Sequence, residues 1–201
     1  MLTPVSTLRA AQKRMTYDLF LDKGLELFGQ KGYAATTVDD IASAAGSTRT
    51  TFYLHFASKA ELMSALLQRV DTILTAADDP SLTEVVESGS PELIRTWLDR
   101  KMTQWDEIKP YLVASYQAAH EPAVIEQTEG WFQSATSDIE KGLERAGRFP
   151  ADRRRMRSIL AFGQLEYVSR RYFAVGWATV DRATALEELT DSWCHLLAAA
   201  S

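Results

Sequence analysis

Apolar residues that return every three or four positions are the feature that most constrains the fold of this chain. In the first such segment they share one side of a helix: Tyr17, Phe20, Leu21, Gly24, Leu27 and Phe28. The same period returns in most later segments, and no stretch shows a convincing strand pattern. The sequence therefore predicts an all-α fold.

Three helical segments are predicted in the first 60 residues. They cover residues 16–31, 37–45 and 48–53, and the glycines at positions 32 and 46 lie in the two connections. Threonine and serine at the start of the second and third segments can accept hydrogen bonds from the free N–H groups of a first turn. Two short helices joined by a tight glycine turn are typical of a helix-turn-helix.

A larger helical region is predicted after this three-helix domain. It begins with a helix over residues 58–77, and we place the domain boundary inside that helix, which gives domains over 1–60 and 61–201. The pair Asp79-Pro80 breaks the helix, because proline cannot continue it. Prolines, glycines and polar breaks then separate five further predicted helices, over residues 91–108, 110–120, 122–146, 152–177 and 182–199.

The last two predicted helices have more apolar surface than one partner would cover. Residues 156–177 are apolar on more than one side, and the final helix carries a stripe that includes Leu189 and Trp193. Pairing with the same helices of a second copy would form a four-helix bundle. We therefore expect a homodimer through the helices near 152–177 and 182–199. The alternative is a core formed wholly within one chain.

The charge of the chain limits its partners. A net charge of -5 and a pI near 5.3 argue against a protein that coats nucleic acid without specificity. The first 70 residues nevertheless carry eight Lys and Arg against six Asp and Glu. Arg9, Lys13 and Arg14 lie together before the first apolar segment, where a basic arm could reach a phosphate backbone. The alternative for these three residues is an ordinary solvated tail.

Cysteine content and hydropathy indicate a reducing, aqueous compartment. Cys194 is the only cysteine, so the chain can form neither an internal disulfide nor a cysteine-based zinc site. No run of about eighteen apolar residues occurs, and the first residues lack the apolar core of a signal peptide. We expect a cytoplasmic protein with no membrane partner.

The third helical segment is rich in side chains that form hydrogen bonds. These residues are Ser47, Thr48, Arg49, Thr50, Thr51, Tyr53 and His55. Arg49 can bind a guanine edge through two hydrogen bonds, and the hydroxyl groups suit phosphate oxygens. Lys59 adds a positive charge at the start of the next helix. A helical hairpin that served only as core would need no such cluster, so the segment is predicted to bind DNA.

One segment of the chain resembles the N-terminal domain of tetracycline-repressor (TetR) family regulators. It comprises residues 19–62, LFLDKGLELFGQKGYAATTVDDIASAAGSTRTTFYLHFASKAEL. The resemblance places Thr37, Thr51, Tyr53, His55 and Lys59 at phosphate-contacting positions and Thr48, Arg49 and Thr50 near base edges, with a structural role as the alternative for His55. Ser47 and Thr50 depart from the family pattern. For the rest of the chain the resemblance implies a helical, dimeric region with no transferable ligand motif.

The second domain is dense in aromatic residues, which could line an apolar cavity. The candidate pocket residues are Trp97, Trp105, Tyr116, Trp131, Phe162 and Tyr167. Gln104 is among the polar residues that could orient a ligand there. Ordinary core packing is the alternative for each of them.

These patterns predict a transcriptional regulator, with repression as the commoner outcome in the family. Its dimer would bind a palindromic double-stranded DNA operator and release it when a small, largely apolar effector binds. We expect no cofactor or metal. A helical enzyme is disfavoured because catalytic motifs such as G-x-S-x-G and H-E-x-x-H do not occur. A helical adaptor that binds protein is the other alternative, and the polar cluster over 47–55 argues against it.

Overall fold

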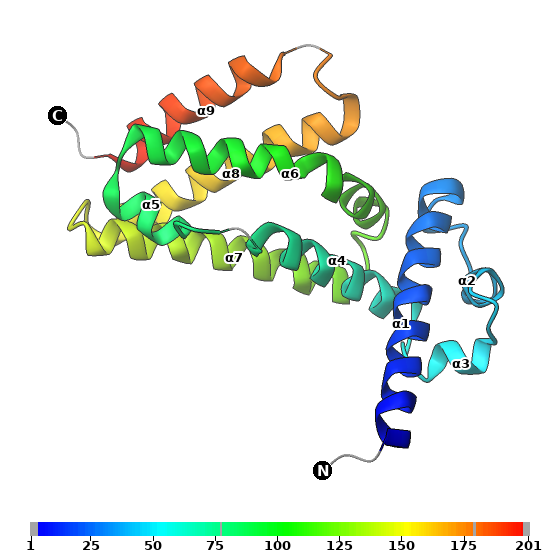
Figure 1. Ribbon diagram of the computed structural model, residues 1–201. Helices are drawn as coiled ribbons and strands as arrows, with labels where there is room; N and C mark the ends of the chain where they lie inside the picture. Colours follow the sequence, from blue (N-terminus) through cyan, green and yellow to red (C-terminus); the bar gives the residue numbers. More distant parts are fainter. Residues whose placement is uncertain (1–3, 77, 179, 199–201) are drawn as a thin grey trace. The chain divides into compact units, whose positions relative to one another are not determined.

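The computed structural model describes residues 4–76, 78–178 and 180–198, and within these ranges all regular structure is helical. The fold is therefore all-α, as predicted, with an N-terminal helix-turn-helix and a larger C-terminal helical part (Figure 1). The helices are α1 (Pro4–Lys31), α2 (Val38–Ala44), α3 (Arg49–Tyr53), α4 (Lys59–Thr75), α5 (Leu82–Ser88), α6 (Pro91–Gln117), α7 (Pro122–Arg145), α8 (Ala151–Val175) and α9 (Arg182–Leu197).

Three features differ from the sequence-based expectation. The first helix was predicted to begin at residue 16, but α1 begins at Pro4, so Arg9, Lys13 and Arg14 lie within the helix instead of before it. Pro110 lies inside α6 instead of separating two helices, so the predicted break there was wrong. Ile108 and Ala114, on either side of the proline, are buried, and this packing offsets a cost of about 3 kcal/mol for an interior proline. The short helix α5 was not expected at all. Ser81 and Glu84 start it with a reciprocal capping box.

The chain forms two compact units. The N-terminal unit comprises the residues up to Asp71 together with Pro110–Gln127, and the C-terminal unit comprises Thr72–Lys109 and the residues from Thr128 onward. Helices α4, α6 and α7 each contribute residues to both units.

The core of the N-terminal unit holds α1 to α4 together. Its central side chains are less than 3% exposed: Phe20, Leu21, Phe28, Ile41, Phe52, Phe56, Leu62, Met63 and Leu66. Three of these rings contact one another, with centroid distances of 5.4 Å between Phe20 and Phe52 and 5.5 Å between Phe52 and Phe56. Aromatic pairs at such distances stabilise a core beyond the burial of their surface.

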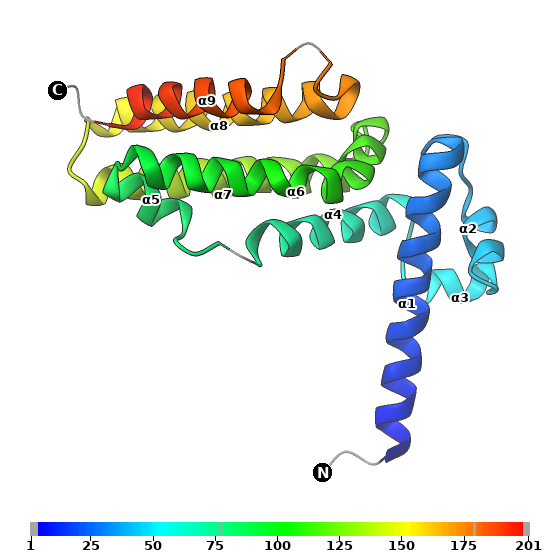
Figure 2. The same cartoon turned by 45° about the horizontal axis from the view of Figure 1, so that its top comes forward.

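In the C-terminal unit, α8 and α9 lie side by side (Figure 2). The rings of Trp97 on α6 and Trp193 on α9 stack with centroids 5.5 Å apart. The Trp193 indole N–H donates to the carbonyl of Ala161 on α8 at 3.0 Å. Trp193, Leu189 and Leu197 are buried within this unit, so the apolar stripe of α9 packs inside its own chain.

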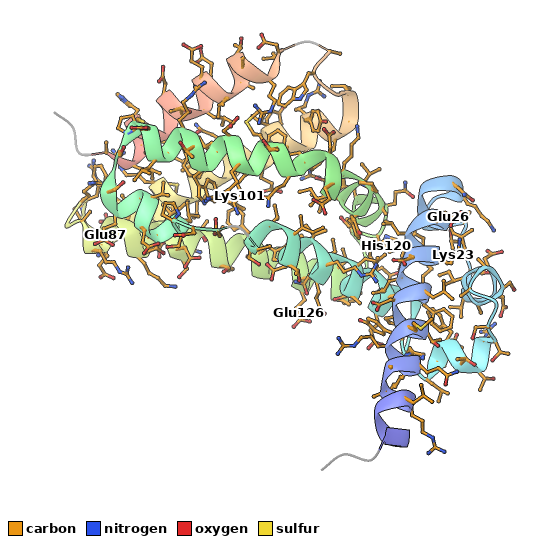
Figure 3. All side chains as sticks on the ribbon, in the orientation of Figure 1. Lys23, Glu26, Glu87, Lys101, His120 and Glu126 are labelled. Carbon is orange, nitrogen blue, oxygen red and sulfur yellow. The ribbon has the colours of Figure 1, made fainter. Side chains whose placement is uncertain are left out.

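Side chains of α6 hold the C-terminal end of α4. The Gln104 amide donates to the carbonyl of Ile73 at 2.7 Å, and the Lys101 ammonium donates to the carbonyl of Leu74. Lys101 points into the C-terminal unit (Figure 3) and also pairs with Asp78 at 3.1 Å. Burial lowers the pKa of Lys101, and the Asp78 carboxylate opposes that shift. The last carbonyl groups of α4 thus find donors that a helix end otherwise lacks.

Candidate nucleic-acid interface

The start of α2 is fixed by Thr37. Its hydroxyl accepts from the Asp40 backbone N–H at 3.1 Å, and the Asp40 carboxylate accepts from the Thr37 backbone N–H at 2.9 Å. The backbone hydrogen bond from Thr37 and the ammonium of Lys31, 2.9 Å away, hold the pKa of Asp40 at about 2. Thr37, a predicted phosphate contact, therefore serves as the N-cap of α2 in this structure.

The turn between α2 and α3 depends on Gly46. Its φ of 60° lies in the left-handed region, which glycine adopts without steric cost. The Ser47 N–H donates to the carbonyl of Ala42 at 2.9 Å, and the Gly46 N–H donates to the carbonyl of Ser43 at 3.0 Å. These bonds satisfy the last carbonyls of α2. Ser47 is compatible with this turn although it departs from the family pattern.

Helix α3 presents a polar face to solvent. Thr48 caps the helix, because its hydroxyl accepts from the Thr51 N–H at 3.1 Å. Arg49, Thr50 and Tyr53 are exposed, whereas Phe52 on the opposite side is fully buried. The half-buried Thr51 shares a hydrogen bond of 2.9 Å with the Thr48 hydroxyl.

Arg49 is held in place by two neighbours. Its guanidinium pairs with Asp39 of α2 at 3.0 Å and donates to the Tyr53 hydroxyl at 3.3 Å. Both the arginine and the aspartate are largely exposed, so an ion pair between them adds little to stability. The interaction orients the guanidinium on the outer surface of the helix-turn-helix without burying it.

His55 packs against aromatic residues behind α3. Its ring centroid lies 5.7 Å from that of Phe20 and 6.2 Å from that of Tyr17. Partial burial, and then the positive charge of Lys13, lower the pKa of the imidazole. His55 is therefore a neutral packing residue near neutral pH, which is the structural alternative considered for it.

Lys59 at the start of α4 binds the connection between α1 and α2. Its ammonium donates to the carbonyls of Tyr33 at 2.6 Å and Thr36 at 2.9 Å, and it lies 4.1 Å from the centroid of the Tyr33 ring. Burial lowers the pKa of Lys59. Two of its three N–H donors are thus used within the chain.

Sequence reasoning missed two polar contacts in the N-terminal unit. Arg69 of α4 pairs with Asp18 at 2.9 Å and Asp22 at 2.6 Å, which joins α4 to α1. The Tyr33 backbone N–H donates to the Gln117 side chain at 2.7 Å, and the Tyr33 hydroxyl donates to Glu121 at 3.0 Å. The partners in each contact are 47 to 88 residues apart in the sequence, so no local pattern could reveal them.

The six candidate pocket residues do not form one cluster. Three of them belong to separate ring contacts: Trp97 stacks on Trp193, Trp105 packs against Tyr172, Phe173 and Trp177, and Phe162 contacts Phe132. Tyr116 belongs to the N-terminal unit. Trp131 is half-buried, and Tyr167 is 67% exposed. The Tyr172 hydroxyl also donates to Asp106. Only Tyr167 of the six lines a groove of about 500 Å³ between α8 and α9.

Buried polar atoms without partners mark three positions in the C-terminal unit. Among the described residues, Nε of Arg100, Oε1 of Gln104 and Nε1 of Trp131 have no hydrogen-bond partner. Such atoms are rare in folded proteins, and each costs about 1–3 kcal/mol when it stays unpaired. Within the described residues no group of three or more His, Cys, Asp or Glu is placed to hold a metal ion. No described helix is long and apolar enough to cross a membrane.

Comparison with known proteins matches the helix-turn-helix to one family. Residues 20–66 fit the family model described as "Bacterial regulatory proteins, tetR family". The HTH-type transcriptional regulator TcmR of Streptomyces glaucescens is 40% identical over 70 residues, which cover 35% of this chain and 31% of TcmR. The match thus spans about a third of TcmR.

Two further comparisons extend along most of the chain. The HTH-type transcriptional activator FasR of Mycolicibacterium smegmatis is 26% identical over 175 residues, which cover 81% of this chain and 74% of FasR. The crystal structure of NalD, the secondary repressor of the MexAB-OprM multidrug efflux pump in Pseudomonas aeruginosa, superposes with a TM-score of 0.67. It is 24% identical, and the superposition covers 92% of this chain and 97% of NalD. That likeness supports the fold alone.

We expect the stability of the protein to fall as the pH drops below about 6.5, partly because of His55. The pKa of His55 is lower in the folded chain than its ordinary value of 6.5, so the unfolded chain binds the proton more readily. The contribution of His55 to the free energy of unfolding is fully present above the pKa that His55 has in the unfolded chain. It is lost as the pH falls, at no more than about 1.4 kcal/mol per pH unit. Urea unfolding at about pH 7.5 and pH 5.5 measures it.

The His55→Gln variant should show a smaller difference between the two pH values. The His120→Gln variant is the comparison, because the His120 side chain lies on the surface and is 72% exposed. An identical pH dependence in the wild type and the His55 variant would contradict the assignment of His55 as a neutral packing residue.

Proposed function

We propose that the chain is a DNA-binding transcriptional regulator of the tetR family of bacterial regulatory proteins, because residues 20–66 fit the model of that family. Its dimer binds a palindromic operator, represses transcription there and leaves the operator when a small, largely apolar effector binds. The observation that carries the proposal is the polar face of α3, where Thr48, Arg49, Thr50 and Tyr53 are exposed above the buried Phe52. TcmR and FasR are transcriptional regulators by name, which argues against the helical enzyme.

The face of α3 suits entry into a major groove. Two recognition helices of a dimer reach successive grooves of B-DNA when they lie about 34–36 Å apart, which is why a palindrome is expected. Arg49 carries the base contact in this proposal, since its guanidinium can bind O6 and N7 of guanine together. Asp39 orients the guanidinium, and Thr48 and Tyr53 are placed to bind flanking phosphates. Lys59 retains one N–H donor for a phosphate, whereas Thr37 and His55 support the fold.

Replacement of Arg49 by alanine should lower operator affinity by about 5- to 150-fold, because a bidentate base contact contributes about 1–3 kcal/mol of discrimination. The operator is first selected from a library of genomic fragments with the wild-type protein, and affinities are measured by fluorescence anisotropy. Arg153→Ala is the control, since Arg153 is an exposed arginine of the C-terminal unit.

An inverted repeat among the selected fragments and selective loss of binding by Arg49→Ala would support the regulator. Failure of the wild type to enrich any fragment at low salt would favour the adaptor. Transcription from the selected operator, measured with and without the protein, distinguishes repression from activation.

The dimer surface proposed here lies on α8. Met156, Leu160, Tyr167 and Val175 recur along one side of this helix and are 56%, 48%, 67% and 45% exposed. Large exposed apolar side chains in a row are typical of an interaction surface. The α8–α9 groove continues this row with Val168 and Leu189 on its walls. Because the stripe of α9 is already buried, α9 supplies the rim of the interface and α8 its centre.

Replacement of both Leu160 and Tyr167 by lysine should convert the dimer to a monomer, because two charges would lose hydration at the interface. Light scattering after gel filtration should give the chain mass of 22.5 kDa for the variant and twice that mass for the wild type. Gly130→Lys is the control, since a Cβ at Gly130 would meet nothing within 4 Å and the residue lies on α7. A dimeric double variant with normal helicity would contradict this surface.

The effector site is proposed to include Gln104, because this residue joins ligand chemistry to α4. Its Nε2 holds the Ile73 carbonyl near the end of α4, and its buried Oε1 can accept a hydrogen bond from a ligand. Trp131 offers a buried donor in the same unit. An apolar molecule with a polar group would satisfy one of these atoms. To move an equilibrium between two arrangements of α4 from 1:99 to 99:1, the effector must bind one arrangement more tightly than the other by about 5.5 kcal/mol. The effector must therefore favour one arrangement of α4 strongly.

A Gln104→Met variant should respond less to the effector, because one hydrogen bond contributes about 1 kcal/mol, or roughly fivefold in affinity. Medium-chain fatty acids and hydroxylated aromatics serve as probes, and release of labelled operator is measured as each is added. Gln133→Met on the exposed surface of α7 is the control. Release by hydrophilic charged metabolites alone would contradict the apolar effector.

A further inference from the structure

The eight Lys and Arg residues of the N-terminal unit fall into two groups. Five are bound within the chain: Lys23 to Glu26, Lys31 to Asp40, Arg49 to Asp39, Lys59 to two carbonyls, and Arg69 to Asp18 and Asp22. The pair Lys23 and Glu26 is visible on α1 (Figure 3). Among the described residues, Arg9, Lys13 and Arg14 have no ion-pair or hydrogen-bond partner, and all three are exposed. The unpaired positive charge of the unit is therefore confined to the first turns of α1.

This part of α1 is a helix without a packing partner. Residues 8–15 are all exposed, whereas the helix is buried from Phe20 onward on one side. Figures 1 and 2 both show the first turns of α1 running beyond α2 and α3. A helical segment of this length has marginal stability in water by itself. The segment also contains no acidic residue before Asp18, so nothing neutralises its charge locally.

The three basic residues continue the side of α1 that faces α3. Tyr17 and Phe20 pack on His55, which lies two residues after the end of α3. With 3.6 residues per turn, Lys13 lies about one turn before Tyr17 on the same side, and Arg9 lies about one turn before Lys13. The charge of Lys13 contributes to the lowered pKa of His55, which is consistent with an ammonium close to that ring. The opposite side of the segment carries the exposed Leu8 and Met15.

We propose that Arg9, Lys13 and Arg14 form a second DNA contact, which binds phosphates of the duplex beside the major-groove segment that α3 reads. The proposal rests on the proposed function, since it extends the same DNA surface. Arg9 lies eight residues before Tyr17, or about 12 Å at 1.5 Å per residue. Successive phosphates of one strand lie about 3.4 Å apart along the duplex axis, so the segment is long enough to reach more than one of them.

A contact of this kind adds affinity without sequence preference. Each cation that neutralises a phosphate releases a counterion, and the logarithm of the affinity then falls more steeply with the logarithm of the salt concentration. The segment should therefore strengthen binding to any duplex long enough to reach it, while discrimination between operator and altered operator stays with α3.

The test is the triple variant Arg9→Gln, Lys13→Gln and Arg14→Gln, because glutamine keeps a helix propensity close to that of lysine and arginine. Operator affinity is measured over a series of salt concentrations, on a duplex with long flanks and on one trimmed to the inverted repeat. On the long duplex, the slope of the logarithm of affinity against the logarithm of salt concentration should become shallower by about 0.9 for each phosphate that the variant no longer neutralises. On the trimmed duplex the variant and the wild type should differ little.

Lys23→Gln is the matched control, because Lys23 lies on the same helix but is already paired with Glu26. It should keep the wild-type slope. A triple variant that retains the wild-type slope and affinity on the long duplex, with normal helicity, would overturn the second contact while leaving the regulator intact. Lack of DNA binding by the wild type would instead overturn the proposed function. A triple variant that keeps operator affinity but no longer binds anionic lipid vesicles would reassign the segment to membranes.

Discussion

The burial of Phe52 is the interaction on which the DNA-facing surface depends. Helix α3 has five residues, too few to be stable as an isolated helix. Its position is set by the contact of Phe52 with Phe20 on α1 and with Phe56 just before α4. Because Phe52 is fully buried, Arg49, Thr50 and Tyr53 must lie on the outer side of the same short helix. The core therefore determines which polar side chains can meet a groove.

Internal pairing decides which charges remain for a partner. Lys59 and Arg69 look like surface cations in the sequence, yet each is bound to groups of α1 or of the connection after it. Lys59 already holds two carbonyls and keeps one donor for a phosphate, whereas Arg9 has all of its donors. Net charge along the sequence shows an excess of basic residues near the N-terminus, but only the folded chain shows which of them are free.

The local features of the fold could be predicted from the sequence, whereas the features set by packing could not. The glycine turn at Gly46 and the cap at Thr48 depend on neighbours in the sequence. Pro110 was expected to end a helix, because its local cost is large and the buried side chains that offset it are not visible in a pattern. Ser81 and Glu84 do carry the spacing of a capping box, so α5 had a local signal that was missed.

The DNA surface could be predicted from the sequence better than the effector site, because the sequence does not show in which direction the side chains of the effector site face. A dense aromatic region was evident, but Trp97 and Trp105 belong to different clusters because their partners come from distant helices. Gln104 has a clearer position, since α4 contributes Lys59–Asp71 to one unit and Thr72–Thr75 to the other. A ligand that takes up the free oxygen of Gln104 would act on the residue that holds the Ile73 carbonyl. Coupling to DNA binding then requires no long chain of contacts, because α4 itself continues into the unit that contains α3.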